Sequence, residues 1–258
     1  MCVGSDGAVA QPLAGAGSKH ELAMQLKSRV SNLITLPLEN DLEFGVGSWD
    51  GTRNTLNIEP VVPFPLHNSK WRLVTRTILP LVYEDPAGAK DASGRSGIGD
   101  INMSCWVAPD HKINDWVFGT GAVLNLPTAH DSLFGYRKWA AGPTAVAVKQ
   151  KGGVTYGIQL NHQWSFGGPG VSDVSATLID PWMSYTWKNG FSVEVESASS
   201  YDWKASQWTV PFRFGIGHLL AGGPLPVNLE LDGLEYVVRA ADDPQWGLSL
   251  TVTFVLKR

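Results

Sequence analysis

The end of the chain, from Trp246 onward, alternates between apolar and polar side chains with a period of two residues. One set of positions holds Leu248, Leu250, Val252, Phe254 and Leu256, and the other holds Ser249, Thr251, Thr253 and Lys257, with Val255 as the single exception. Side chains of a β-strand point alternately to its two faces, so this segment predicts a strand with one apolar and one polar face. Because the same period recurs along almost the whole chain, we expect an all-β protein.

The alternation predicts about twelve strands and one helix. The strands are expected at 34–46, 52–64, 71–83, 98–108, 116–127, 139–149, 153–166, 174–187, 191–199, 208–219, 226–239 and 246–257. Before them, Leu22, Leu26 and Val30 recur at intervals of four, which predicts a short amphipathic helix from Lys19 to about Leu33. We therefore divide the chain into a flexible leader with this helix, residues 1–33, and a β-barrel, residues 34–258.

The connections between the strands tend to alternate in length. Short ones are expected at 67–70, 110–115, 150–152, 188–190 and 221–224, and longer ones at 84–97, 128–138, 167–173 and 200–207. Two further connections, 47–51 and 240–245, are short although the alternation predicts long connections at their positions. Short turns on one rim and long loops on the other are typical of outer-membrane barrels. An even strand count then places both termini on the short-turn side.

Tryptophan placement and low charge favour a membrane-spanning barrel. Charged residues make up 17% of the chain, below the roughly 25% of soluble domains. Tryptophans open or close many predicted strands, as in the aromatic girdles of such barrels: Trp71, Trp116, Trp139, Trp208 and Trp246 open strands, and Trp106, Trp164 and Trp187 lie near strand ends. We expect a closed, antiparallel, up-and-down barrel in the bacterial outer membrane. The alternative is a soluble or secreted β-sandwich that binds a ligand and has these tryptophans in its core or on its surface.

The polar faces of the strands would line the lumen of the barrel. Apolar residues such as Phe212 and Phe214 would then face lipid. The candidates for a lumen constriction are Arg72, Arg76, Arg213, Glu59, Asp100, Glu194, Glu196 and Glu230. Such a ring of charges can select solutes by charge and size. The same residues could instead form ion pairs that only stiffen the wall, and the sequence leaves both interpretations open.

Several classes of function find no support in the residues. A net charge of −4 lacks the basic stripe of a nucleic-acid-binding protein. The histidines show no metal-ligand spacing, Cys2 and Cys105 suggest no disulfide framework, and no cofactor motif occurs. His130, Asp131 and Ser132 are contiguous, which is no evidence for a catalytic triad. We expect no enzymatic activity, with an outer-membrane hydrolase or acyltransferase as a third alternative.

The start of the chain lacks the apolar core of a secretory signal peptide. The stretch Ala8-Val9-Ala10 nevertheless has the form that precedes a cleavage site. We therefore expect the natural start to differ from Met1, and the alternative is an intact cytosolic start.

Nine short strings, in a consistent order between about residues 31 and 257, are similar to those of a known family. They are Ser31–Pro37, Phe44–Gly47, Asn57–Phe64, Thr75–Pro80, Gly97–Asn102, Leu126–Ala129, Trp139–Pro143, Trp164–Gly168 and Trp208–Pro211. They resemble the bacterial outer-membrane β-barrel transporters associated with the meta-pathway of phenol degradation, some of which carry a neuromedin U label. The chain departs from the usual barrel ending, because its last residue is not aromatic.

The resemblance implies an outer-membrane channel for small, aromatic or hydrophobic molecules. Passage would be passive, since the sequence contains no energy-coupling motif. The expected partners are the lipid bilayer, a small-molecule solute and the barrel-assembly machinery that inserts such proteins. The resemblance carries over no catalytic or ligand-binding residues.

Overall fold

The computed structural model describes residues 19–66, 70–85, 93–223 and 225–256. The predicted leader 1–18, Lys257 and part of the predicted loop 84–97 lie outside these residues. The elements are α1 (Lys19–Leu26), β1 (Ile34–Val46), η1 (Gly47–Trp49), β2 (Gly51–Ile58), β3 (Val61–Pro65), β4 (Trp71–Asp85), β5 (Arg95–Ile98), β6 (Ile101–Pro109), β7 (Trp116–Leu126), β8 (Trp139–Lys151), β9 (Val154–Gly167), β10 (Ser175–Thr186), β11 (Phe191–Glu196), β12 (Ser199–Asp202), β13 (Gln207–Leu220), β14 (Val227–Val238) and β15 (Trp246–Leu256).

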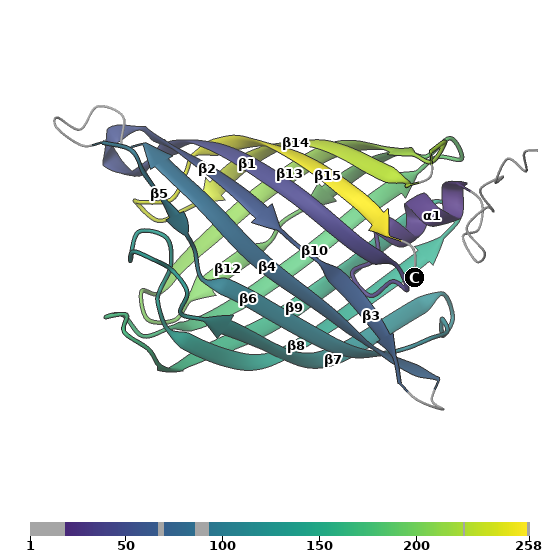
Figure 1. Cartoon of the computed structure of the whole chain (residues 1–258), viewed down its shortest axis with the longest axis horizontal. Helices are drawn as coiled ribbons and strands as arrows, with labels where there is room; N and C mark the ends of the chain where they lie inside the picture. The colour runs from purple at the N-terminus through teal and green to yellow at the C-terminus, as the bar shows by residue number, and fades with distance from the viewer. Residues whose placement is uncertain (1–18, 67–69, 86–92, 224, 257–258) are drawn as a thin grey trace, which may run out of the picture.

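The strand segments form one closed antiparallel barrel (Figure 1). Three of its strands are each interrupted once, so that β2 and β3, β5 and β6, and β11 and β12 are consecutive parts of single strands between shared neighbours. The barrel therefore has twelve strands, and it closes because β1 pairs with β15 along eleven residue pairs. The predicted fold and strand number are confirmed.

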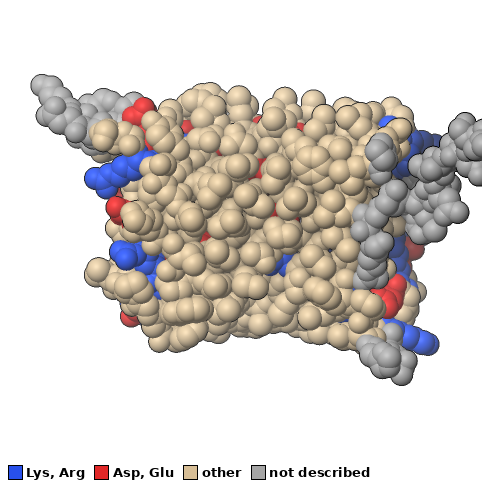
Figure 2. All heavy atoms as spheres, in the orientation of Figure 1, with Lys and Arg blue, Asp and Glu red and all other residues tan. Residues whose placement is uncertain are grey.

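The outer surface of the barrel is apolar between two charged rims. Figure 2 shows few charged atoms on the visible side wall and clusters of Lys, Arg, Asp and Glu at both ends. On β13, Phe212, Phe214 and Ile216 point outward and are 48%, 52% and 43% exposed, whereas Arg213 points to the lumen. A wide apolar surface of this kind is covered by lipid rather than water. The soluble β-sandwich is therefore not the fold of this chain.

The two rims differ in their connections. The rim near α1 and the C-terminus (Figure 1, right) has tight turns, such as Gly152-Gly153 between β8 and β9. The opposite rim includes the long connection from Pro127 to Lys138. There β12 extends a predicted strand to Asp202, so the predicted long loop 200–207 is reduced to residues 203–206. By the usual orientation of such barrels, the rim with α1 faces the periplasm.

The helix is shorter than the sequence pattern predicted. It ends at Leu26, and residues 27–33 continue without regular structure inside the barrel. Val30 continues the four-residue spacing because it is buried, with 0% exposure, and not because it is helical. Wall carboxylates bind Lys27 and Arg29 on either side of the chain at this point, which favours an irregular path over another helical turn.

The periplasmic half of the interior is packed with apolar side chains. Val30 belongs to a buried cluster whose other members are Val74, Trp106, Ala108, Val117, Val146, Val148 and Trp182. Burial of each large side chain contributes about 1.5–3 kcal/mol. A second cluster joins Leu22 and Ala23 of α1 to Leu219 and Val255. The exception in the alternation of the last strand, Val255, therefore faces α1.

The tryptophans divide between the girdles and this interior cluster. Trp71, Trp139, Trp208 and Trp246 are 39–49% exposed on the outside of the barrel, as predicted. Trp106 is instead fully buried inside, where its indole N–H donates to Thr144 Oγ1 at 3.2 Å. Because Cys105 and Val107 take the outward positions of β6, Trp106 has to point inward.

Candidate functional site

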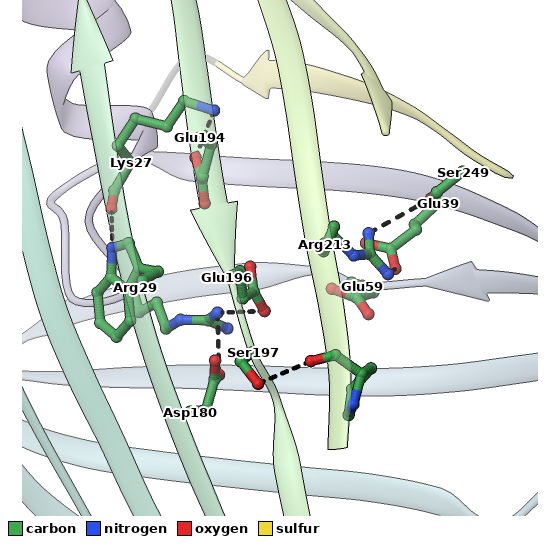
Figure 3. A network of polar contacts seen from close by, with 12 residues as sticks. Lys27, Arg29, Glu39, Glu59, Asp180, Glu194, Glu196, Ser197, Arg213 and Ser249 are labelled. Atoms are coloured by element: carbon green, nitrogen blue, oxygen red, sulfur yellow. Dashed lines mark hydrogen bonds and ion pairs between the residues drawn. The ribbon is translucent and has the colours of Figure 1, made fainter. Parts of the chain in front are cut away.

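Three cavities border the lumen among the described residues, and two of them follow one another along it; the third, of about 280 Å³, is bordered by Asp41, Thr209 and Tyr236. The outer cavity, of about 470 Å³, lies toward the long-loop rim and is bordered by Tyr136, Gln159 and Asn161. The inner cavity, of about 170 Å³, lies beside residues 26–31 toward the periplasmic rim. Five charged residues line both cavities: Arg29, Glu39, Arg76, Glu196 and Arg213. We call these five residues the constriction, and Figure 3 shows four of them.

Arg213 of β13 reaches across the inside of the wall to β1. Its guanidinium Nη2 lies 3.0 Å from Glu39 Oε1 and 3.4 Å from Asp41 Oδ1, and Nη1 lies 3.4 Å from Ser249 Oγ. The strands β14 and β15 lie between β13 and β1 in the sheet. The side chain therefore spans two strands within the lumen, where only a long, polar side chain can make these contacts.

Arg76 of β4 pairs with Glu59, which lies in the break between β2 and β3. The distance from Arg76 Nη2 to Glu59 Oε2 is 2.7 Å. The break contains Pro60, which has no N–H to donate to a neighbouring strand. The Glu59 side chain is only 7% exposed, whereas that of Arg76 is 21% exposed. Both side chains border the inner cavity, and Arg76 also borders the outer one.

Arg29 is the constriction residue that does not belong to the barrel wall. Its Nη2 atom lies 2.9 Å from Asp180 Oδ2 of β10 and 2.8 Å from Glu196 Oε1 of β11. Its guanidinium carbon lies 4.6 Å from the ring centroid of Trp182. The two carboxylates and the indole ring of Trp182 therefore hold the Arg29 guanidinium in one position at the junction of the two cavities (Figure 3).

The remaining predicted site residues lie in three places. Glu194 and Glu230 border the inner cavity and both bind Lys27, with Lys27 Nζ 2.7 Å from Glu194 Oε2. Arg72 lies nearer the periplasmic rim, where it binds Asp110 at 3.0 Å and the backbone oxygen of Val30 at 2.7 Å.

Asp100 lies apart from the lumen network. It sits at the break between β5 and β6 and accepts hydrogen bonds from the backbone N–H groups of Ala129, at 3.0 Å, and Arg137, at 2.8 Å. Its carboxylate thereby holds the long connection between β7 and β8 against the rim, and it does not line either cavity.

Five charged residues near the lumen were not predicted: Lys27, Arg29, Glu39, Asp41 and Asp180. The three carboxylates occupy inward positions of β1 and β10 and could have been found from the alternation alone. Asp232 of β14 has the polar phase that the alternation predicts for a lumen residue, although it was not among the constriction candidates. No such signal existed for Lys27 and Arg29. Together, four basic and seven acidic side chains line the inner and outer cavities, an excess of three negative charges.

The described residues contain no cluster of three or more His, Cys, Asp or Glu side chains that could hold a metal ion. Within them, no helix is long and apolar enough to span a membrane. Asp131 accepts hydrogen bonds from the Leu133 N–H and the Ser132 hydroxyl, which lower the pKa of its carboxyl group. This arrangement caps a turn and does not activate the Ser132 hydroxyl.

A histidine with two hydroxyl neighbours lies on the outside of the barrel. The Nδ1 atom of His162 is 2.7 Å from Thr177 Oγ1, and its Nε2 atom is 3.5 Å from Ser175 Oγ. The imidazole ring also packs against Trp164, with 4.1 Å between the ring centroids and an angle of 49° between the ring planes. The group lies at the level of the outer aromatic girdle.

No protein-family model and no curated protein sequence matches the chain. Solved structures do match. An outer-membrane channel from Pseudomonas putida F1 is 14% identical with a TM-score of 0.66, over 88% of this chain and 96% of that chain. The NanC porin is 13% identical with a TM-score of 0.52, over 86% of this chain and 100% of its own.

An active-site mutant of outer membrane phospholipase A from Escherichia coli matches as well. It is 9% identical with a TM-score of 0.52, over 95% of this chain and 99% of that one. At these identities the likeness concerns the fold. The chain is therefore similar in architecture to bacterial outer-membrane barrels, which agrees with its apolar outer surface. The more specific resemblance to the phenol-degradation family is not confirmed.

Proposed function

We propose that this protein is a passive channel of the bacterial outer membrane for small molecules. The observation that carries the proposal is the pair of cavities that meet at the charged constriction inside a closed barrel. Twelve strands lie between the eight-stranded barrels that side chains fill and the 16-stranded porins with wide channels. The lipid bilayer is the surrounding partner, and the barrel-assembly machinery would insert the chain.

The lining of the cavities supports small solutes that carry polar groups. Gln159 and Asn161 border the outer cavity. The inner cavity is lined by six acidic and four basic side chains, and this negative excess favours cations over anions. Aromatic solutes, which the family resemblance implies, would also meet the rings of Tyr136 in the outer cavity and Trp182 in the inner one. An aromatic ring with hydroxyl or amino substituents could use both kinds of partner.

Liposome swelling with solutes of graded size tests this proposal. We expect the folded protein to admit small polar and small aromatic solutes and to exclude larger oligosaccharides. The heat-dependent gel shift of a folded barrel serves as the control for insertion. If vesicles that contain folded barrel swell no faster than empty vesicles with any solute, the channel function is wrong.

A hydrolase is the second candidate, and the contact between His162 and Ser175 is the observation that favours it. A histidine base near a serine hydroxyl is the minimal arrangement for nucleophilic catalysis, although 3.5 Å is at the limit of a hydrogen bond. The test is turnover of a fatty-acyl ester by the folded protein. Turnover that Ser175→Ala abolishes, while the gel shift is retained, would support this candidate over a channel alone.

A further inference from the structure

Residues 19–33 lie at the periplasmic end of the lumen and narrow it, and we propose that Arg29 of this segment is a selectivity residue of the constriction. The role of Arg29 rests on the channel function proposed above. Below, "the plug" means residues 19–33, which comprise α1 and the irregular chain after it.

Three side chains of the barrel wall donate hydrogen bonds to backbone oxygens of the plug. Gln150 of β8 donates to Met24, Trp182 of β10 donates to Lys27 at 3.1 Å, and Arg72 of β4 donates to Val30 at 2.7 Å. Carbonyl oxygens at the end of a helix have no partner within the helix. Here the wall supplies hydrogen-bond donors from three different strands, and these bonds fix the position of the plug against the wall.

The wall also presents an apolar surface where it contacts the plug. Val30 is fully buried against inward-facing residues that include Val74, Trp106 and Val148. These residues break the rule that the inner face of a channel is polar. The outer cavity is bordered by polar side chains such as Asn102, Gln159 and Asn161 together with Ile78 and Leu178. The buried cluster that contains Val30 therefore lies where the plug contacts the wall.

Ion pairs also join the plug to the wall, at Lys27 and at Arg29. Lys27 binds Glu194 and Glu230, and Arg29 binds Asp180 and Glu196. The Lys27 side chain is 6% exposed and that of Arg29 is 17% exposed. Each cation therefore lies between two carboxylates from the wall, which is a stronger arrangement than a single exposed ion pair.

Arg29 gives the plug a direct role in the pore. It is the one constriction residue that the plug supplies, and both cavities border it. A solute that moves from the outer to the inner cavity has to pass its guanidinium. Removing this charge leaves Asp180 and Glu196 with no plug cation and opens space between the cavities.

Limited proteolysis of the full-length, folded protein in detergent tests whether the plug is seated. Trypsin cuts after Lys27 and Arg29, and we expect these bonds to be cleaved at least about tenfold more slowly than in heat-unfolded protein, because a seated chain must first open locally. The double variant Glu194→Gln and Glu230→Gln removes the partners of Lys27. It should accelerate cleavage at Lys27 in barrels that still show the heat-dependent gel shift.

Planar-bilayer recordings test the role of Arg29. Arg29→Ala should raise the cation-to-anion permeability ratio about twofold or more, because the local field becomes more negative, and should raise the conductance. Arg29→Lys keeps the charge and should retain most of the wild-type ratio. Lys151→Ala is the matched control, because it removes one positive charge from a rim side chain that is 77% exposed and should change neither value.

Each outcome decides one part of the proposal. Cleavage at Lys27 and Arg29 as fast in the folded as in the unfolded protein would overturn the plug. Slow cleavage together with a conducting channel that Arg29→Ala leaves unchanged would overturn the role of Arg29 but not the channel function. Slow cleavage with no current from the wild type or any variant would overturn the channel function, and the role of Arg29 with it, but would support the seated plug.

Discussion

Neighbouring residues of one strand face two different solvents in this barrel. Phe212 points outward near the middle of β13 and is 48% exposed. We predict that Phe212→Arg impairs insertion, since a lipid-facing cation at the middle of the bilayer costs about 2–4 kcal/mol. The fraction that shows the heat-dependent gel shift after refolding into vesicles measures this effect.

Arg213, the next residue, supplies the comparison. Arg213→Ala removes the partner of Glu39 and Asp41 inside the lumen. We predict that this variant still inserts, because water can solvate these carboxylates, and that its channel becomes more cation-selective. Equal insertion defects in Phe212→Arg and Arg213→Ala would contradict the assignment of the two faces.

Single residues also show what the sequence could reveal about the interior. Trp106 was predicted near an aromatic girdle and lies inside the barrel instead, a position that its phase on β6 indicates because Cys105 and Val107 face outward. The exception at Val255 marked an apolar contact inside the barrel. By contrast, Arg29 lies in a segment without period-two alternation. No pattern in the sequence indicates that this segment turns into the lumen, because the contacts that hold it come from strands about 40 to 200 residues away.

At the scale of elements, the turn between β8 and β9 shows how backbone geometry fixes a hairpin. Gly152 and Gly153 have φ angles of +59° and +91°, as in a two-residue turn that matches the twist of the strands. A Cβ atom on Gly153 would lie 2.8 Å from the backbone oxygen of Thr186, whereas one on Gly152 would meet nothing within 4 Å.

We therefore predict that Gly153→Ala destabilises the barrel by about 1–3 kcal/mol, through both the positive φ and the close contact. Gly152→Ala is the matched control and should cost about 1 kcal/mol, because only its positive φ is unfavourable. Urea unfolding of the refolded barrels in detergent measures both values. A larger loss of stability for Gly152→Ala than for Gly153→Ala would show that the turn has a different geometry.

The strands were the most predictable elements, since a wall between lipid and a polar lumen forces the period of two. Each predicted strand overlaps an observed one, and the first, 34–46, coincides with β1. The interruptions at residues 59–60, 99–100 and 197–198 were not predicted, because local breaks leave the alternation of the strand almost unchanged. The predicted helix was longer than the observed α1, because Val30 is buried for a reason unrelated to helical periodicity.

The whole molecule combines a lipid-facing barrel with a lumen that is narrowed from one end. Barrel closure could be predicted from the strand count and the turns. The lumen network depends on pairs between distant strands, such as Arg213 with Glu39, and alternation predicts which residues face inward but not which of them meet. Most of the inward-facing candidates were therefore predictable, with Asp100 as an exception, whereas the constriction and its plug required the structure.

The most direct test of this account is the reversal potential of single channels under a salt gradient. Because seven acidic and four basic side chains line the inner and outer cavities, we predict a reversal potential shifted toward the equilibrium potential of the cation. Because these cavities are small, we also predict a small conductance. High salt should weaken this preference by screening the charges. A reversal potential toward that of the anion at low salt, from barrels that show the heat-dependent gel shift, would contradict the account.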